Sequence, residues 1–406
     1  MTHVRVPTKK ALQIGVVKMM FLFYSRPDST SVMDVAKANL NFLAKVYSFL
    51  LKSAGNENNM VVSPFSMSAV MAMALAGARG STGGQMRSVF SFPDKEKDTI
   101  EGYKAILSGL GEAHDVTLDT ANSLFVNQNY QILETYQAAM KEYFKASPMT
   151  LDFAKGEEAR KVINSWVEEK TNDKIKELIP SGSISDLTRL ILVNAVYFKG
   201  NWRDMFEVEE TKKEDFTMLD GSKEKVDMMT RKGKYNFAVN NDLRCTILMM
   251  PYKGERLSML IYLPNDPAEF KELEAKFTSL DPADFQVMER EFIVALPKFK
   301  IETTHEEMVS NLKELGLIDI FDPAKADLSG ISGSKDLHVS DMVQKAFIEV
   351  NEEGCEAAAA TAMMMKALMM PASPKKFYCN RPFLFAIRDN QTGMMLFAGR
   401  VVNPTK

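Results

Sequence analysis

A stretch of small and sulfur-containing side chains near the C-terminus constrains the fold of this chain more than any other feature. It reads VNEEGCEAAAATAMMMKALMMPASP over residues 350–374 and lies between segments rich in β-prone residues. Alanine favours helix, so a surface helix or a linker is one interpretation. The flanking segments favour another, a long loop that joins two strands. Loops of this length inside a compact domain are usually functional or disordered.

Composition limits the classes of protein to which the chain can belong. Its 406 residues contain no internal linker rich in proline, glycine or serine, which predicts one large domain. The formal net charge is -3, with acidic and basic residues interleaved, so we expect no nucleic-acid partner. No apolar run is long enough to span a membrane. Three cysteines are too few for a disulfide framework, and their odd number suits free thiols or a reduced compartment.

The first 32 residues differ from the rest of the chain. Lys9 and Lys10 precede the apolar segment ALQIGVVKMMFLFY, which is the basic-then-apolar order of a secretory signal. Lys18 interrupts that segment, and no small-residue cleavage site follows it cleanly. Residues 1–32 are therefore either a weak signal-like segment or a disordered leader, and Met33 opens the expected folded domain at 33–406.

Hydrophobic periodicity predicts helices mainly in the first half and strands mainly in the second, which indicates an α+β fold. Ser63 and Pro64 form a strong start for a buried helix, because the hydroxyl caps the first turn and proline suits its first position. The almost continuously apolar segment Leu190–Phe198 predicts a strand covered on both faces. A surface helix is expected at 156–178, with Val162 and Ile163 on its apolar face. Other helices are expected at 34–53, 81–90, 97–111 and 132–145, and other strands at 60–62, 116–126, 233–240, 244–250, 257–263, 285–300, 337–350, 383–388 and 395–402.

The sequence lacks the motifs of common catalytic sites. It has no GxSxG, no phosphate-binding GxxxxGK[ST], no dinucleotide-binding GxGxxG and no HExxH. The histidines have no cysteine or histidine at metal-ligand spacing, so each is interpreted as a surface or structural residue. They are His3, His114, His305 and His338. We therefore expect no enzyme activity, no cofactor and no metal.

Four separated motifs carry a resemblance to the serpins, which covers roughly residues 34–406. They are SPFSMSAVMAMALAGARGST at 63–82, NAVYFKGNW at 194–202, EVNEEGCEAAAATA at 349–362 and FYCNRPFLFAIRDNQTGMMLFAGRVVNP at 377–404. The resemblance implies three β-sheets, about nine helices and an exposed reactive-centre loop at 354–374. It also implies inhibition of a serine endopeptidase by a suicide-substrate mechanism, in which the cut loop inserts into the central sheet while the peptidase is held as an acyl-enzyme.

The resemblance assigns further residues to three regions. The hinge of the loop is Gly354, Cys355, Glu356, Ala357, Ala358, Ala359, Ala360 and Thr361. The breach, at the top of the central sheet, is Trp202, Lys298 and Glu352. The shutter, where the central strands part, is Ser63, Pro64, Asn194 and Gln344. Two residues depart from the family pattern, because Gln344 stands where many serpins have histidine and Cys355 stands where threonine or serine is usual.

Alternate residues of a strand share one face, so Cys355, Ala357, Ala359 and Thr361 would point into the core after insertion. All four are small enough to enter a sheet. A charge or a proline among them would stall insertion. The competing function is a non-inhibitory serpin-fold carrier, storage protein or chaperone, for which we would expect a bulky, charged or proline-containing hinge.

Hinge spacing in serpins places the reactive bond between Leu368 and Met369. Leucine at this position suits a chymotrypsin-like or elastase-like peptidase, and cleavage after Lys366 by a trypsin-like peptidase is the alternative.

A monomer is expected. Heparin is not expected as a partner, because the helix at 97–111 offers few basic residues, Lys104 among them. For localisation, the resemblance to the serpins favours secretion, whereas the imperfect leader and the unpaired cysteines favour the cytoplasm.

Overall fold

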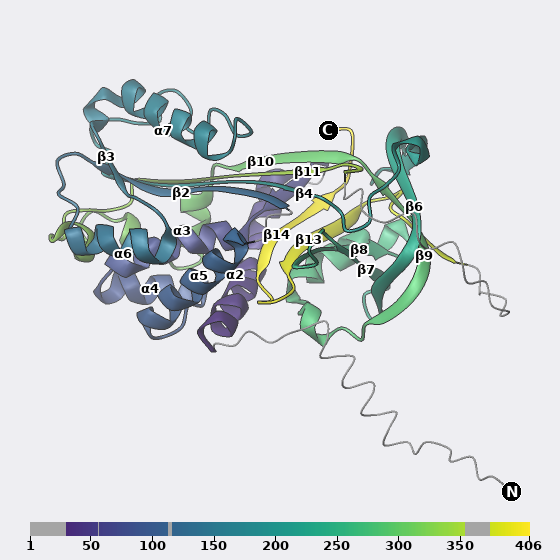
Figure 1. Cartoon of the computed structure of the whole chain (residues 1–406). Helices are drawn as coiled ribbons and strands as arrows, with labels where there is room; N and C mark the ends of the chain where they lie inside the picture. The colour runs from purple at the N-terminus through teal and green to yellow at the C-terminus, as the bar shows by residue number, and fades with distance from the viewer. Residues whose placement is uncertain (1–29, 56, 113–115, 354–373) are drawn as a thin grey trace, which may run out of the picture.

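The computed structural model describes residues 30–55, 57–112, 116–353 and 374–406. In these ranges the helical half of the chain lies against one end of two β-sheets (Figure 1). The α-helices are α2 (Thr30–Ala54), α3 (Pro64–Gly77), α4 (Gly80–Phe90), α5 (Glu96–Gly111), α6 (Glu134–Phe144), α7 (Gly156–Lys170), α8 (Phe270–Lys276), α9 (Met308–Glu314) and α10 (Ser329–Ser332). The predicted α+β class and the nine or so helices are confirmed within this part of the chain.

Most strands come from the second half of the chain, as predicted. They are β1 (Met60–Val62), β2 (Val116–Asn127), β3 (Met149–Leu151), β4 (Leu190–Gly200), β5 (Lys212–Thr217), β6 (Lys223–Asn240), β7 (Cys245–Pro251), β8 (Leu257–Pro264), β9 (Met288–Pro297), β10 (Phe299–His305), β11 (Asp341–Val350), β12 (Lys375–Tyr378), β13 (Phe383–Asp389) and β14 (Met395–Val401).

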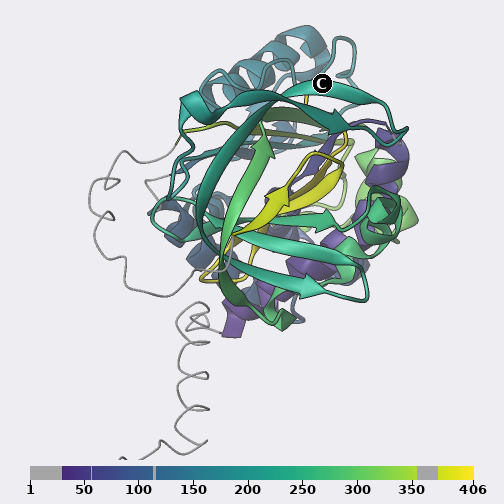
Figure 2. The same cartoon turned by 90° about the vertical axis from the view of Figure 1, so that its right-hand side faces the viewer.

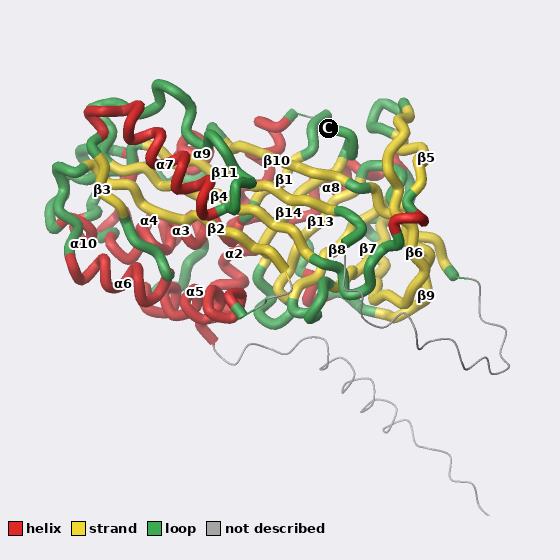
Figure 3. The backbone as a smooth tube through the Cα atoms, turned by 45° about the horizontal axis from the view of Figure 1, so that its top comes forward, coloured by secondary structure: helices red, strands yellow, loops and turns green. Residues whose placement is uncertain are grey.

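The smaller sheet has five strands in the order β10-β11-β4-β2-β3. Strands β11 and β4 are parallel neighbours, paired from Asp341 opposite Ile191 to Glu349 opposite Lys199. Helix α7 lies on the outer side of this sheet, and α3, α5 and α6 lie on the other side (Figures 1 and 3). This sheet is therefore the middle layer of the helical half.

The larger sheet has nine strands. Eight follow the order β1-β14-β13-β8-β7-β6-β9-β12, and β5 pairs with β6. Strand β6 is 18 residues long and pairs with β5 through residues 223–228, with β9 through 228–237 and with β7 through 236–240. Because β6 pairs with all three of these strands, it joins them into one sheet. The resemblance implies three sheets, and the described strands form two hydrogen-bonded sheets. The larger one is strongly curved (Figure 2).

Strand β4 is buried on both faces, as its apolar sequence predicts. Its residues Ile191, Val193, Ala195 and Tyr197 join the cluster under α7, whereas Leu190, Leu192, Val196 and Phe198 join the main core. This alternation is the period-two pattern of a strand between two packed layers. Burial of both faces fixes the register of β4, because a shift by one residue would exchange the two sets.

Helix α3 begins as predicted. The Ser63 hydroxyl oxygen accepts a hydrogen bond from the Ser66 backbone amide at 3.1 Å, and Pro64 occupies the first turn. All residues of the helix except Ala76 are buried. The helix contacts β2, β4 and β14, so its N-terminus is held between the two sheets.

Helix α7 is shorter than predicted. It ends at Lys170 and not at residue 178, and Asn172 and Asp173 then adopt positive φ angles of 48° and 61°. Two successive residues in the left-handed region cannot continue a right-handed helix. Val162 is 42% exposed, so it does not belong to the buried face formed by Ala159, Ile163 and Val167. Those three residues follow the i, i+4 spacing of a single helical stripe.

Several other boundaries differ from the prediction. Helix α2 begins at Thr30 and not at residue 34, so it starts before Met33, the expected first residue of the domain, and residues 1–29 lie outside the described part of the chain. Strand β11 begins at Asp341 and not at Leu337. Segment 285–300 divides into β9 of the larger sheet and β10 of the smaller sheet, and at Lys298 between them the amide still donates to the Asp227 carbonyl of β6.

Strand β6 also begins earlier than predicted, at Lys223 instead of residue 233. Its first residues alternate exposed charged side chains with buried Val226 and Met228, so an apolar run does not reveal them. No helix of the described residues is long and apolar enough to cross a membrane.

The close approach of β1, β13 and β14 gives a test of this packing. A Cβ added at Gly399 would lie 2.3 Å from the Met60 carbonyl oxygen and 2.8 Å from the Phe385 ring. Gly399→Ala should lower stability by about 1–3 kcal/mol, because the β1 backbone cannot move aside cheaply. The midpoint of urea unfolding measures this effect. Gly84→Ala, in α4 with no atom within 4 Å of the added Cβ, is the control and should be neutral or slightly stabilising. Equal midpoints for Gly399→Ala and the unchanged protein would contradict this packing.

Candidate functional site

The candidate site is the pair of parallel strands β11 and β4, together with the residues that hold their ends. Strand β11 ends at Val350, four residues before the reactive-centre loop. The hinge residues 354–361 and the reactive-bond candidates Lys366, Leu368 and Met369 lie outside the described residues. The described part of the site therefore consists of the smaller sheet, which contains β11 and β4, and of the two chain segments that lead into and out of the loop.

The breach residues meet where β11 ends. Lys298 Nζ lies 2.9 Å from Glu352 Oε2, and the Thr211 hydroxyl donates to Glu352 Oε1 at 2.9 Å. Burial of Glu352 raises its pKa, but hydrogen bonds from Lys298, its own backbone and Thr211 outweigh burial and leave the pKa below its usual value. Glu352 is therefore held as a carboxylate at neutral pH.

Trp202 fixes the backbone on either side of Glu352. Its indole Nε1 donates to the Asn351 carbonyl at 2.9 Å, and its backbone amide donates to the Glu353 carbonyl at 3.0 Å. The indole is buried and stacks on Tyr252 with ring centroids 4.5 Å apart. The last residues before the loop are thus held by a charged pair and by a rigid aromatic side chain.

The shutter residues also lie together, at the N-terminus of α3. Gln344 Nε2 donates to the Ser63 carbonyl at 3.1 Å and to Asn194 Oδ1 at 2.6 Å. The Ser63 hydroxyl donates to the Leu396 carbonyl at 2.7 Å. Pro64 follows in the first turn of the helix. Side chains from β11, β4 and α3 therefore converge at one point in the core.

Two further residues complete this network, and the sequence analysis missed both. Asn194 Nδ2 donates to Asn122 Oδ1 at 2.5 Å and also to the Ser66 hydroxyl. That hydroxyl in turn donates to Asn122 Oδ1 at 3.0 Å. An asparagine inside each of two apolar strands was the available signal, because a buried amide needs partners.

Strand register extends the network into a line across four strands. Asn122 lies opposite Asn194, Asn194 opposite Gln344, and Gln344 opposite His305 of β10. We call these four residues the polar row. His305 is buried, with Nε2 3.0 Å from the Val61 carbonyl oxygen, so it is one of the structural histidines that the sequence predicts.

The polar row adds side-chain bonds to the ladder between β11 and β4. Gln344 Oε1 is buried and has no hydrogen-bond partner among the described residues, so one acceptor of the row remains unsatisfied. Separating β11 from β4 would break the Gln344–Asn194 bond and would open a gap beside that acceptor. The arrangement thus suits a pair of strands that is closed but can accept a further strand between them.

The described residues offer no site for metal or thiol chemistry. No group of three or more His, Cys, Asp or Glu side chains in this part of the chain is placed to hold a metal ion. Cys245 and Cys379 are buried free thiols. Burial raises the pKa of Cys245 to about 12 and that of Cys379 still further, so both are protonated and unreactive at neutral pH.

His305 predicts a pH dependence of stability. Burial lowers its pKa from 6.5 to about 4, although the hydrogen bond to the Val61 carbonyl partly opposes this. As pH falls below 6.5 the unfolded chain takes up a proton before the folded protein does, so stability present above pH 6.5 is lost towards pH 4. The slope for this group reaches about 1.4 kcal/mol per pH unit.

His305→Gln should therefore flatten the fall of the thermal midpoint between pH 6.5 and pH 4, as measured by differential scanning fluorimetry. The midpoints of the two proteins at pH 7.5 serve as the control for the substitution itself. Parallel curves over the whole range would exclude His305 as the titrating group.

Comparisons with known proteins agree with this architecture. The family model described as Serpin (serine protease inhibitor) matches residues 37–404. Leukocyte elastase inhibitor A of Mus musculus is 40% identical over 382 residues, which covers 91% of this chain and all of the relative.

Two solved structures are similar over most of their length. Serpin48, described as a highly specific serpin in the insect Tenebrio molitor, has a TM-score of 0.81 and 37% identity over 91% of this chain and 98% of its own. Native protease nexin-1 with heparin has a TM-score of 0.81 and 31% identity over 92% of this chain and 99% of its own. The matched domain, the identity and the shared architecture show that the chain belongs to the serpins.

Proposed function

We propose that the chain inhibits a serine peptidase as a suicide substrate, with residues 354–374 as bait and the β11–β4 pair as the place of insertion. As a serpin, it is a protease inhibitor and not an enzyme. The observation that carries the proposed mechanism is the direct parallel pairing of β11 with β4, because β11 leads into the reactive-centre loop.

The covalent step uses the chemistry of the peptidase. Its serine oxygen attacks the Leu368 carbonyl carbon, the Leu368–Met369 amide bond breaks, and Met369 leaves with a free amine. Leu368 remains joined to the serine as an ester. Hydrolysis of that ester would release the peptidase, so permanent inhibition requires insertion to finish before water attacks.

The topology explains how insertion can proceed. Insertion would require the chain to reverse direction after β11, so the cut loop would run antiparallel to both β11 and β4. One parallel ladder would become two antiparallel ladders, which are slightly more stable per residue. About fourteen inserted residues at roughly 3.3 Å each would carry the attached peptidase some 45 Å along the sheet. The uncut protein must then be held in a metastable state.

The hinge residues suit this change of environment. Cys355, Ala357, Ala359 and Thr361 would face the core, and Ala358 would face outward between them. The core-facing residues of β11 are Met342, Gln344, Ala346, Ile348 and Val350, which are buried. An inserted strand with small inward side chains can fit beside them without overpacking.

The breach and shutter residues would act as two latches in this mechanism. The Lys298–Glu352 pair and Trp202 hold the end of β11 at which insertion would begin. The Gln344–Asn194 bond holds its middle. Both sets hold β11 through hydrogen bonds and an ion pair, which must be exchanged as the loop enters.

The proposed target is a chymotrypsin-like or elastase-like peptidase. Leu368 is the apolar residue at the expected bond, and a relative of 40% identity is named for inhibition of leukocyte elastase. A trypsin-like target that cleaves after Lys366 is the alternative. Inhibition by this route needs only one copy of the chain, which supports a monomer.

Heparin is not a partner in this proposal, although the similar protease nexin-1 structure contains it. Helix α5 has two lysines, Lys97 and Lys104. Lys104 lies 3.0 Å from Glu142 and over the Tyr143 ring, so its charge is already partnered. One remaining lysine gives this helix little attraction for a polyanion.

For localisation, secretion and retention in the cytoplasm are the two alternatives that the sequence leaves. N-terminal sequencing of the natural protein distinguishes them. A chain that begins near residue 30 would indicate removal of a secretory leader, whereas a chain that retains the first residues would favour the cytoplasm.

The reactive bond can be tested directly. Incubation with chymotrypsin should give a complex that survives SDS, and mass spectrometry of the released C-terminal peptide should show that it begins at Met369. Leu368→Arg is the matched variant and should transfer complex formation from chymotrypsin to trypsin. Cleavage of the unchanged protein only after Lys366 would overturn the assignment of the bond.

The insertion step has its own test in the hinge. Ala357→Arg should turn the inhibitor into a substrate and raise the stoichiometry of inhibition at least about tenfold, because an unpaired charge would have to enter the core. Ala358→Arg carries the same charge on the outward face and should inhibit almost normally. Titration of a fixed amount of chymotrypsin measures both. Efficient permanent inhibition by Ala357→Arg would exclude insertion in this register.

A further inference from the structure

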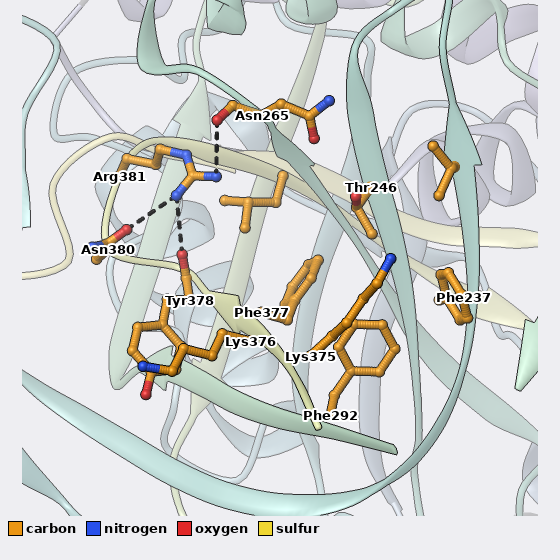
Figure 4. A pocket seen from close by; sticks show the side chains of 12 residues that line it. Phe237, Thr246, Asn265, Phe292, Lys375, Lys376, Phe377, Tyr378, Asn380 and Arg381 are labelled. Carbon is orange, nitrogen blue, oxygen red and sulfur yellow. Dashed lines mark hydrogen bonds between the residues drawn. The ribbon is translucent and has the colours of Figure 1, made fainter. Parts of the chain in front are cut away.

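A cavity of about 300 Å³ lies at the far end of the larger sheet from β1, beside the strand that follows the reactive-centre loop (Figure 4). Its walls come from β6, β7, β8, β9 and β12 and from the segment after β12. This volume is at the lower end of the range for small-molecule sites, about 300–1,000 Å³. The breach and shutter residues do not line it.

One wall of the cavity is aromatic. Phe292 of β9 packs edge-to-face against Phe237 at 5.1 Å and against Phe377 at 6.4 Å between ring centroids. All three rings are buried, and Leu263 lines the cavity beside them. These side chains offer an apolar surface that is fixed by strand register and so is formed before any ligand arrives.

The charged side chains that line the cavity are all positive. Lys375, Lys376 and Arg381 line the cavity, and no acidic side chain among the described residues does. Figure 4 shows Lys375 extending from β12 towards Thr246, whereas Lys376 lies beside Tyr378, with Nζ 5.5 Å from the ring centroid. Both lysines are exposed, and no ion pair within 4.0 Å involves either of them among the described residues.

Arg381 supplies a fixed positive charge. Its guanidinium donates to the Pro264 carbonyl at 2.7 Å and 2.9 Å, to Asn380 Oδ1 at 3.1 Å and to the Tyr378 carbonyl at 3.3 Å. These acceptors are neutral, and burial lowers its pKa. The nearby carboxylates have other partners, since Glu269 pairs with Arg244 and Asp266 caps the following turn.

We propose that this cavity binds a small organic carboxylate with an apolar body. The carboxylate would lie at the mouth, paired with Lys375 and attracted by the charge of Arg381. The apolar body would lie against Phe237, Phe292 and Leu263. A simple inorganic anion would leave the aromatic wall unused, and a neutral apolar molecule would leave the positive charges uncompensated.

The position of the cavity links such a ligand to the strand that follows the reactive-centre loop. Strand β12 begins at Lys375, directly after the loop, and pairs with β9 through Lys375 opposite Phe292. A bound ligand would therefore contact the strand that anchors the C-terminal end of the loop. Binding itself does not depend on the proposed inhibitory mechanism, so either proposal can fail without the other.

The test uses the intact protein and 4-phenylbutyrate as the probe, with binding followed by isothermal titration calorimetry. We expect saturable binding that weakens as salt concentration rises. Acetate has the charge without the apolar body, and 4-phenyl-1-butanol has the body without the charge. Both should bind at least about tenfold more weakly, a factor that corresponds to about 1.4 kcal/mol. Equal binding of the alcohol and the carboxylate would overturn the proposal.

Variants locate the binding. Lys375→Glu should weaken binding of 4-phenylbutyrate at least about tenfold by reversing the charge at the mouth. Thr246→Phe should weaken it by filling the cavity. Lys161→Glu, an equal charge change at an exposed position on α7, should have no effect. Thermal midpoints check that each variant is folded. If Lys375→Glu and Thr246→Phe bind like the unchanged protein, the ligand lies elsewhere and the proposal is wrong.

Discussion

The parallel pairing of β11 with β4 is the interaction on which the rest of this structure depends. Strand β4 is buried on both faces, between the cluster under α7 and the main core, so its position is fixed. Strand β11 is held to it by the ladder, by the Gln344–Asn194 bond and by the contacts at its end. Each of these is a hydrogen bond or an ion pair, and such contacts can be exchanged for equivalent ones when a strand is added.

The polar row shows how the protein keeps this pairing specific. A buried amide without a partner costs about 1–3 kcal/mol, so Asn122, Asn194 and Gln344 stabilise the closed sheet only while their strands remain in register. The same bonds disfavour a slipped arrangement, in which the amides would meet apolar side chains. An apolar row would bind the strands without this dependence on register, and so would specify the closed state less sharply.

Different interactions hold the two chain segments on either side of the reactive-centre loop. On the N-terminal side, Glu352 is fixed by Lys298, and the neighbouring backbone by Trp202. On the C-terminal side, β12 pairs with β9, and its lysines lie over a cavity with an aromatic wall. The first anchor lies at the end of the sheet that would accept the loop. The second belongs to the larger sheet, in which β12 pairs with β9.

The sequence by itself determined the elements whose signals are local. Continuous apolar residues predicted β4, Ser63 and Pro64 predicted the start of α3, and four motifs identified the family. It also placed Glu352 with Lys298 through that resemblance. Tertiary structure alone decided where α7 ends, how far β6 extends, how Ser66 and Asn122 join Asn194 and Gln344, and that His305 lies opposite Gln344. The reason is physical: these residues are far apart in the chain, and only the register of the strands and the packing of α3 against them bring their side chains together.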